Sequence, residues 1–229
     1  MKLLITSRAD DNIKEMTDIT FDTIKAYAKK CGADFMRLDH DSGCTHQEGK
    51  WHYRILKHYD LFEEYDRILH IDSDVLVSNC APNIFDIVPY EKIGTVYEDK
   101  GSRRPARHQC IRKVQQMYGD VGWVEGYINT GFFLSSKCHR DIFTKINGTD
   151  FYEDWGHDDV HLGYQLNKHG MEVMELPYTW NHMSMFSEPW NGSPNRFDSY
   201  VIHYAGAGIF EGTGSRLEQI KRDNSVWYS

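Results

Sequence analysis

The chain has 229 residues and a formal net charge of −8, with 40% hydrophobic and 14% aromatic residues. This length allows one large α/β domain or two small ones, and the apolar content is sufficient for a buried core. The acidic balance argues against general binding to nucleic acid or to an anionic membrane surface. Five cysteines form no Cys-x-x-Cys pair, so we expect reduced thiols rather than a disulfide framework.

The apolar N-terminal run is too short for a signal peptide, and no run in the chain reaches transmembrane length. We therefore expect no transmembrane segment and a cytoplasmic location, in a bacterium or in the cytosol of a virus-infected host.

The first hundred residues alternate between strand and helix patterns. Strands are expected at 3–7, 34–38, 67–71 and 93–97, and helices at 13–30 and 51–64. Gly32 ends the first helix in the usual way, with lysines in its last turn. A strand, helix, strand start of this kind indicates a parallel sheet in an α/β fold.

The second half is less regular. Residues 100–109 are basic and polar, and we interpret them as a mobile loop. Strands are expected at 127–134, where Gly131 interrupts the pattern, 171–176 and 201–204, and helices at 139–147, at 161–169 and from about 215. No linker is visible, so we expect a single domain. Its first half spans about 1–100, its second half about 101–210, and a C-terminal helix about 215–229.

The most informative feature is Asp72-Ser73-Asp74, which follows the apolar run at 67–71 and precedes Val75-Leu76-Val77. In an extended chain, residues i and i+2 point to the same side. Two carboxylates held together repel unless a cation or a proton lies between them, and hard oxygen ligands suit Mg²⁺ or Mn²⁺. The alternative is an acidic turn that caps the next element.

Asp158 and Asp159 precede an apolar helical pattern. Plain helix capping, which stabilises by about 0.5–2 kcal/mol, is one interpretation. The other is a carboxylate that faces the reacting centre as a base, a nucleophile or a ligand for sugar hydroxyls.

Two later segments and one helix add candidates. Asn129 and Gly131 lie in a β-rich run, where Gly suggests close approach of a ligand; the alternative is a bulge with Asn129 hydrogen-bonded to the backbone. His203 ends the last strand and could bind Mn²⁺, and the turn at Gly206 could approach a diphosphate; the alternative is a core histidine before a turn. Arg54 and Lys57 precede the acidic pair and could contact phosphate, although a solvated helix face is the commoner explanation.

Taken in order, these motifs resemble the metal-dependent nucleotide-sugar glycosyltransferases of the GT-A fold, and especially glycosyltransferase family eight and its virus-encoded relatives. The resemblance covers roughly residues 3–208. It rests on the stretch around Asp72 and Asp74, on Tyr53-Arg54-Ile55, on Asn129-Thr130-Gly131, on Leu176-Pro177-Tyr178-Thr179-Trp180-Asn181, and on His203-Tyr204-Ala205-Gly206.

The resemblance implies a Rossmann-like, mixed but mostly parallel sheet flanked by helices, with the nucleotide-binding half at about 1–100 and the acceptor-side half at about 101–210. It implies that Asp72, Asp74 and His203 bind Mn²⁺ (or Mg²⁺), and that a UDP-sugar is the donor. Residues toward the donor would then be Thr6, Ser7, Arg8, Arg54, Lys57, Asp72, Ser73, Asn129 and Gly206. Asp158 and Asp159 would lie on the sugar side as the catalytic acids. The acceptor would be a glycan, a glycolipid or a protein, and no nucleic acid is expected.

The chain also departs from that family. No Lys-Pro-Trp follows Gly206, so the charge of the diphosphate must be neutralised by another residue, with Arg216 or a loop arginine as candidates. His157-Asp158-Asp159 stands where the family tends to have Asp-Gln-Asp, and it equally resembles the acidic pair of certain inverting transferases. Retention is favoured by the wider match, and inversion, with Asp158 or Asp159 as the base, is the alternative.

Two further alternatives remain at this stage. A phosphohydrolase of the haloacid-dehalogenase type also has an Asp-x-Asp after an apolar strand, but its pair lies near the N-terminus and Gly-Thr follows it. The other alternative is a sugar-nucleotide-binding module without catalytic activity.

Overall fold

The computed structural model describes residues 1–39, 51–148, 156–206, 210 and 214–227. Residues 40–50, which include Cys44 and two of the histidines, lie outside the described residues, as do 149–155 and most of the glycine-rich segment after Gly206. No described helix is long and apolar enough to cross a membrane.

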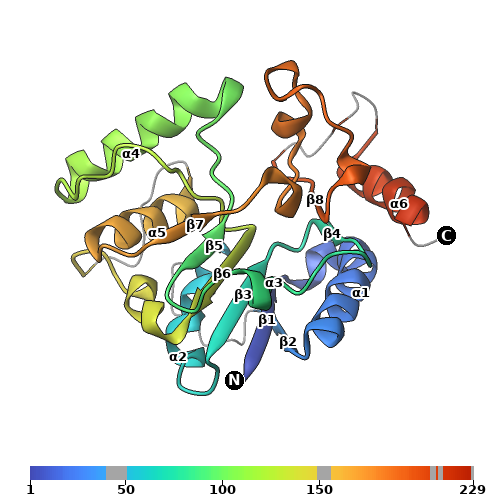
Figure 1. Ribbon diagram of the computed structural model, residues 1–229, viewed down its shortest axis with the longest axis horizontal. Helices are drawn as coiled ribbons and strands as arrows, with labels where there is room; N and C mark the ends of the chain where they lie inside the picture. The colour runs from blue at the N-terminus through green and yellow to red at the C-terminus, as the bar shows by residue number, and fades with distance from the viewer. Residues whose placement is uncertain (40–50, 149–155, 207–209, 211–213, 228–229) are drawn as a thin grey trace.

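A six-stranded sheet forms the centre of the molecule (Figure 1), with the strand order β2-β1-β3-β6-β5-β7. Only β6 runs antiparallel to its neighbours, so the expectation of a mixed, mostly parallel sheet is confirmed. The strands are β1 (Leu3–Arg8), β2 (Asp34–Leu38), β3 (Arg67–Ile71), β5 (Ile93–Thr95), β6 (Phe132–Ser136) and β7 (Val173–Glu175).

Alternate strand residues build two separate cores on the two faces of the sheet. Ile5, Leu69 and Leu134 pack with α1 (Lys14–Cys31), whereas Leu4, Ile68 and Phe133 pack with α5 (His157–Lys168). This is the period of two that a pleated strand imposes on its side chains. Burial on both faces explains why these strands are apolar almost throughout.

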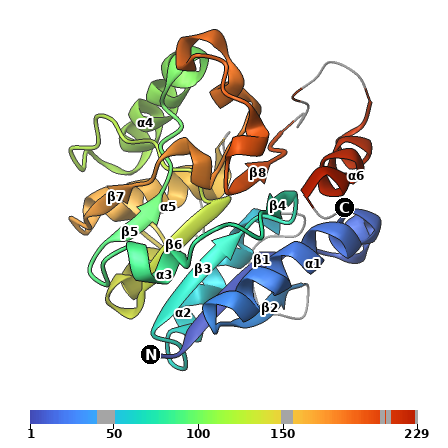
Figure 2. The ribbon, with the colours of Figure 1, turned by 45° about the vertical axis from the view of Figure 1, so that its right-hand side comes forward.

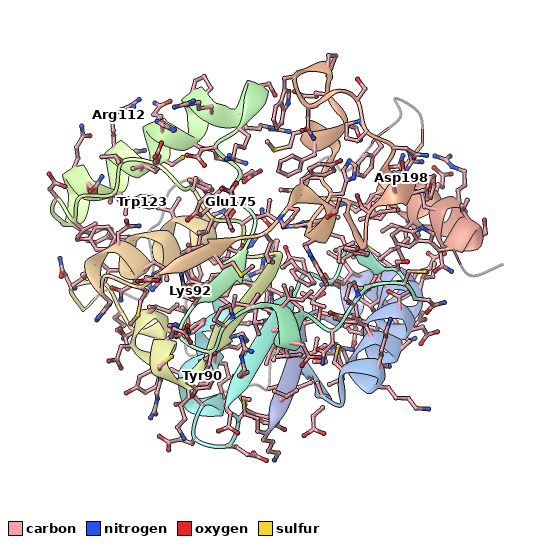
Figure 3. The ribbon with its side chains drawn as sticks, in the orientation of Figure 1. Tyr90, Lys92, Arg112, Trp123, Glu175 and Asp198 are labelled. Carbon is pink, nitrogen blue, oxygen red and sulfur yellow. The ribbon has the colours of Figure 1, made fainter. Side chains whose placement is uncertain are left out.

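The remaining helices are α2 (His58–Leu61), α3 (Ile84–Ile87), α4 (Arg104–Tyr118) and α6 (Arg216–Trp227). Trp123 lies between α4 and α5 and packs against both, while Arg112 points outward from α4 (Figure 3). The first turn of α1 follows a short 3₁₀ helix capped by Asp10, and its last turn ends at Gly32 with φ +66°. Gly tolerates this left-handed conformation, which closes the helix as the sequence predicted.

A second, two-stranded sheet pairs β4 (Val75–Val77) with β8 (Val201–His203), antiparallel and with Val75 opposite His203. Leu76, Ile202 and Tyr204 pack there with Ile220 of α6. Figure 2 shows α6 beside α1 at this end of the molecule. The small sheet therefore joins the middle and the end of the chain next to the carboxyl end of β3.

Four local expectations were wrong. The strand expected at 127–134 begins only at Phe132 and runs to Ser136. Residues expected as a mobile loop at 100–109 form the 3₁₀ turn Gly101–Arg103 and the start of α4. These polar residues begin a helix and not a loop. Arg107 is buried against Glu98, and the apolar face of α4 begins only at Cys110. The helices expected at 51–64 and 139–147 are largely 3₁₀, at Trp51–Lys57 and Lys137–Phe143.

Candidate active site

Asp72 and Asp74 lie in the turn between β3 and β4, and not within one continuous strand. The Asp72 amide donates to Gly131 O at 2.9 Å, and the hydroxyl of Thr20 on α1 donates to Ser73 O at 2.7 Å. These contacts hold the turn from both sides. Both carboxylates still approach one point, so the i, i+2 argument reached the right result through the wrong local geometry.

The pairing of β4 with β8 brings His203 to that point. The amide of Tyr204 donates to Asp74 O at 3.0 Å, which aligns the two strands beside the turn. His203 Nε2 then lies 3.3 Å from Asp74 Oδ1 and 3.6 Å from Asp72 Oδ2. Candidate ligand atoms of the three residues all lie within 4.8 Å of one another. We call Asp72, Asp74 and His203 the metal triad.

A chain of side-chain amides fixes the orientation of the His203 ring. Asn129 Oδ1 accepts from the Gly131 amide at 3.0 Å and from Asn181 Nδ2 at 2.8 Å. Asn181 must therefore turn its carbonyl oxygen toward His203 Nδ1, 2.8 Å away, and an amide oxygen can only accept. Nδ1 therefore carries a proton, and Nε2 is the ring nitrogen that faces the two carboxylates, where it can donate a proton to them or bind a cation between them.

The triad fits a hard divalent cation. It offers carboxylate oxygens and an imidazole nitrogen, which are ligands for Mn²⁺ and Mg²⁺. Asp72 Oδ1 is buried and makes no hydrogen bond of good geometry with the described residues, although the Arg8 guanidinium lies 2.7 Å away. The amide chain behind His203 is the outer-shell support that histidine ligands characteristically have.

The charges around the triad favour a cation in the same way. Burial opposes protonation of His203, but Asp74 and Asp72 outweigh it and raise the pKa of the imidazole. Burial also opposes ionisation of Asp72, yet Arg8, His70 and His203 hold the pKa of this carboxyl below its usual range. The pocket therefore keeps its carboxylate charge and attracts positive partners.

Arg8, at the end of β1, connects the triad with the helix start at α5. Its guanidinium pairs with Asp72 at 2.7 Å and makes a short contact with Asp158, and the side chain is only 7% exposed. Burial disfavours the charged form of Asp158, but the Arg8 guanidinium outweighs it and lowers the pKa of this carboxyl. Asp158 thus favours its ionised form, with Oδ2 facing Arg8 and Oδ1 3.5 Å from His52 Nδ1.

Asp159 differs from its neighbour although both belong to the first turn of α5. Its Oδ1 accepts from the Thr130 amide at 2.8 Å, and the Thr130 hydroxyl, which has one proton to donate, lies 2.8 Å from both Asp159 Oδ1 and Asp158 Oδ2. Burial, Asp158 and Glu98 together raise the pKa of Asp159 well above its usual value. The two adjacent acids therefore have opposite protonation tendencies, which is how functional sites separate an acid from a base.

A cavity of about 630 Å³ joins these groups. Of the predicted site residues, the following line it: Arg8, Arg54, Asp72, Ser73, Asp74, Asn129, Asp158, Asp159, His203 and Gly206. Arg54 is buried there and donates to Ala9 O at 3.0 Å and to Leu38 O at 3.3 Å, which ties the ends of β1 and β2 together.

Thr6, Ser7 and Lys57 do not line the cavity. Thr6 is buried and its hydroxyl lies between His58 and His70, at 2.8 and 3.0 Å. Ser7 is also fully buried in β1. Lys57 pairs with Asp60 on the next turn at 2.8 Å, as a solvated helix face would.

Gly131 is close to a protein side chain rather than to a ligand. A Cβ at this position would overlap the His203 ring and Asn129 Oδ1. The glycine therefore makes room for the third member of the triad, which sequence reasoning could not know.

Sequence reasoning gave no role to Asn181, Thr130 or His52. Asn181 stood in a matched motif but carried no chemical signal of its own. His52 Nδ1 lies 3.5 Å from Asp158 Oδ1, and its ring stacks on His157 with centroids 4.6 Å apart. Only the fold reveals these neighbours, because they lie far from the acidic pairs in sequence.

Three solved structures with a similar fold are glycosyltransferases. One, involved in glycosylation of the major capsid of PBCV-1, aligns with a TM-score of 0.60 and 17% identity over 97% of this chain and 100% of that one. The galactosyltransferase LgtC gives 0.61 and 18% over 99% and 96%. The bifunctional WbbM gives 0.64 and 13%, covering 99% of this chain and 50% of that one.

Identities this low establish the fold alone, which is the GT-A fold. The comparison with curated protein sequences found no match. Residues 10–208 match the sequence profile of glycosyl transferase family 8, and the chain belongs to that family. The family and the fold together support a nucleotide-sugar glycosyltransferase. The phosphohydrolase alternative is therefore wrong.

Proposed function

We propose that this enzyme transfers a hexose from a UDP-sugar to a hydroxyl group in a Mn²⁺-dependent reaction, with retention at the anomeric carbon. The observation that carries the proposal is the metal triad with its amide chain. Asn129 and Asn181 turn His203 Nε2 toward the same point as two carboxylates, which gives a set of three ligand atoms suited to a divalent cation.

Each part of the cavity then has a task. Asp72, Asp74 and His203 hold the cation, which supplies charge neutralisation for the departing diphosphate. Arg8 keeps Asp158 ionised beside the developing positive charge of an oxocarbenium-like centre. The Thr130 amide orients Asp159, and the Thr130 hydroxyl lies between Asp158 and Asp159. Arg54 and Asn129 border the donor.

Retention is supported by the family match and by the state of the two acids. A general base for inversion needs an ionised carboxylate with a lone pair directed at the acceptor. Asp158 is ionised but already paired with Arg8, and the raised pKa of Asp159 favours its protonated form. ¹H NMR of the first product formed from an α-linked UDP-sugar tests this point, since a β-linked product would establish inversion.

For the acceptor, we propose a glycan, a glycolipid or a glycosylated protein. The similar structure that takes part in capsid glycosylation supports a protein-linked acceptor among these.

The first experiment is calorimetric titration of UDP into the protein with and without Mn²⁺, followed by a screen of UDP- and GDP-sugars for Mn²⁺-dependent hydrolysis. We expect Mn²⁺-dependent UDP binding and turnover of one UDP-hexose. UDP binding that is independent of metal would refute the triad assignment. Metal-dependent binding with no turnover of any donor or acceptor would instead favour a binding module without catalysis.

A further inference from the structure

Arg216 places a positive charge directly on the metal triad. It is the first residue of α6, and its Nη1 lies 2.9 Å from Asp74 Oδ2. Its Nη2 makes a short hydrogen bond to Gly206 O, so the side chain reaches back across the turn after β8. Arg216 also lines the cavity.

The other cavity arginines with buried guanidinium groups already have fixed partners. Arg8 is 7% exposed and held by Asp72 and Asp158, and Arg107 is 8% exposed and paired with Glu98. Arg54 is bonded to backbone carbonyls. The Arg216 side chain is 35% exposed, so solvent reaches it and its ion pair with Asp74 is weakly held.

Arg216 and a divalent cation compete for the same carboxylate. In this structure the guanidinium balances Asp74, and His203 approaches the other oxygen of that group. A divalent ion at the triad would take over the charge balance of Asp74. The guanidinium would then be released beside the cation site, where it could contact a diphosphate, and a planar guanidinium suits bidentate contact with phosphate.

We propose that Arg216 exchanges partners during donor binding, from Asp74 in the metal-free protein to the diphosphate in the metal-bound complex. This inference rests on the proposed function, because it assumes that the triad holds a cation and that the donor is a nucleoside diphosphate sugar. It assigns a diphosphate-binding residue to the C-terminal helix and couples metal binding to donor binding through one side chain.

The exchange predicts effects of opposite sign in a single variant. Arg216→Met removes the competitor of the cation, so Mn²⁺ alone should bind about 3- to 10-fold more tightly, by calorimetry or by Mn²⁺ electron paramagnetic resonance. The same variant loses a phosphate contact, so UDP in the presence of Mn²⁺ should bind about 10-fold more weakly. Uridine, which has no phosphate, should bind as it does to the wild type.

Arg222→Met is the matched control, since Arg222 is exposed on the same helix and does not line the cavity. Arg216→Lys keeps the charge and should restore part of the UDP affinity. If Arg216→Met weakens both Mn²⁺ and UDP binding, Arg216 only supports the site and the exchange is refuted. Unchanged affinities would also refute it. If the wild-type protein binds neither Mn²⁺ nor UDP, the proposed function itself is refuted. The results for the variants test only the exchange of partners by Arg216.

Discussion

The two ends of the cavity use the same residue types for different purposes. The metal triad keeps two carboxylates close together with one imidazole nitrogen directed at them. The other end, which we call the carboxylate cluster, gathers Asp158, Asp159 and Glu98, where Arg8 and Arg107 balance two of the charges and burial raises the pKa of Asp159. An aspartate therefore becomes a metal ligand or a reactive acid according to what its neighbours supply.

The largest expected effect comes from the triad. Asp74→Asn should reduce Mn²⁺-dependent turnover of the UDP-sugar by about 100- to 1,000-fold, because the cation loses a charged ligand where diphosphate charge develops. Steady-state kinetics over a Mn²⁺ series measures this. Asp18→Asn, on the exposed side of α1, is the control. Equal turnover by Asp74→Asn and the wild type would refute the assignment of Asp74 as a metal ligand, and with it the difference between the two ends of the cavity.

The carboxylate cluster should respond differently. Asp158→Asn should lower turnover by about 100-fold while Mn²⁺ affinity stays within about 3-fold, since the triad and its amide chain are untouched. Arg8 keeps Asp72 as a partner, so the variant should fold, with a loss of about 3 kcal/mol in the free energy of unfolding. A parallel loss of metal binding would mean that Asp158 belongs to the metal site.

The amide chain gives a smaller and more selective effect. Asn181→Leu removes the acceptor for His203 Nδ1–H, which frees the ring to turn or to change tautomer. Loss of such an outer-shell partner should weaken Mn²⁺ binding by about 10- to 100-fold. Calorimetric titration with Mn²⁺ tests this. An equal loss of Mn²⁺ affinity in Asn191→Leu, a variant outside the cavity, would show that the effect is not specific to the amide chain.

The smallest effect is a pair of opposite pH dependences in metal-free protein. The pKa of Asp158 is lowered, so its stabilising contribution is present above the unfolded value near 4 and is lost as pH falls below it. The pKa of Asp159 is raised, so the folded state binds more protons and stability falls as pH rises above about 4.

Urea unfolding of wild type, Asp158→Asn and Asp159→Asn across pH 3–8 measures both slopes. Each pKa unit corresponds to about 1.4 kcal/mol. Relative to the wild type, Asp159→Asn should lose the decline above pH 4, and Asp158→Asn should lose the decline on acidification. The same slope in both variants would show that the two acids do not differ.

The strands of the first half could be predicted because local patterns determine them. The apolar runs at 34–38 and 67–71 matched β2 and β3 residue for residue. Helix α4 could not be predicted in this way, since its basic first turns are buried or solvated according to tertiary partners such as Glu98. Lys57 was predicted to reach the cavity because it lies close to the acidic pair in sequence. Its side chain instead pairs with Asp60 and does not line the cavity.

The sequence by itself determined the α/β class, the acidic pair at Asp72 and Asp74, and the order of motifs that led to family 8. These depend on spacing along a strand and on local periodicity, which are properties of neighbouring residues. Tertiary structure alone decided which distant groups meet that pair. The pairing of β4 with β8 delivered His203, Asn181 fixed its tautomer, and α6 brought Arg216 to Asp74. Long-range packing sets those distances, and no local pattern encodes them.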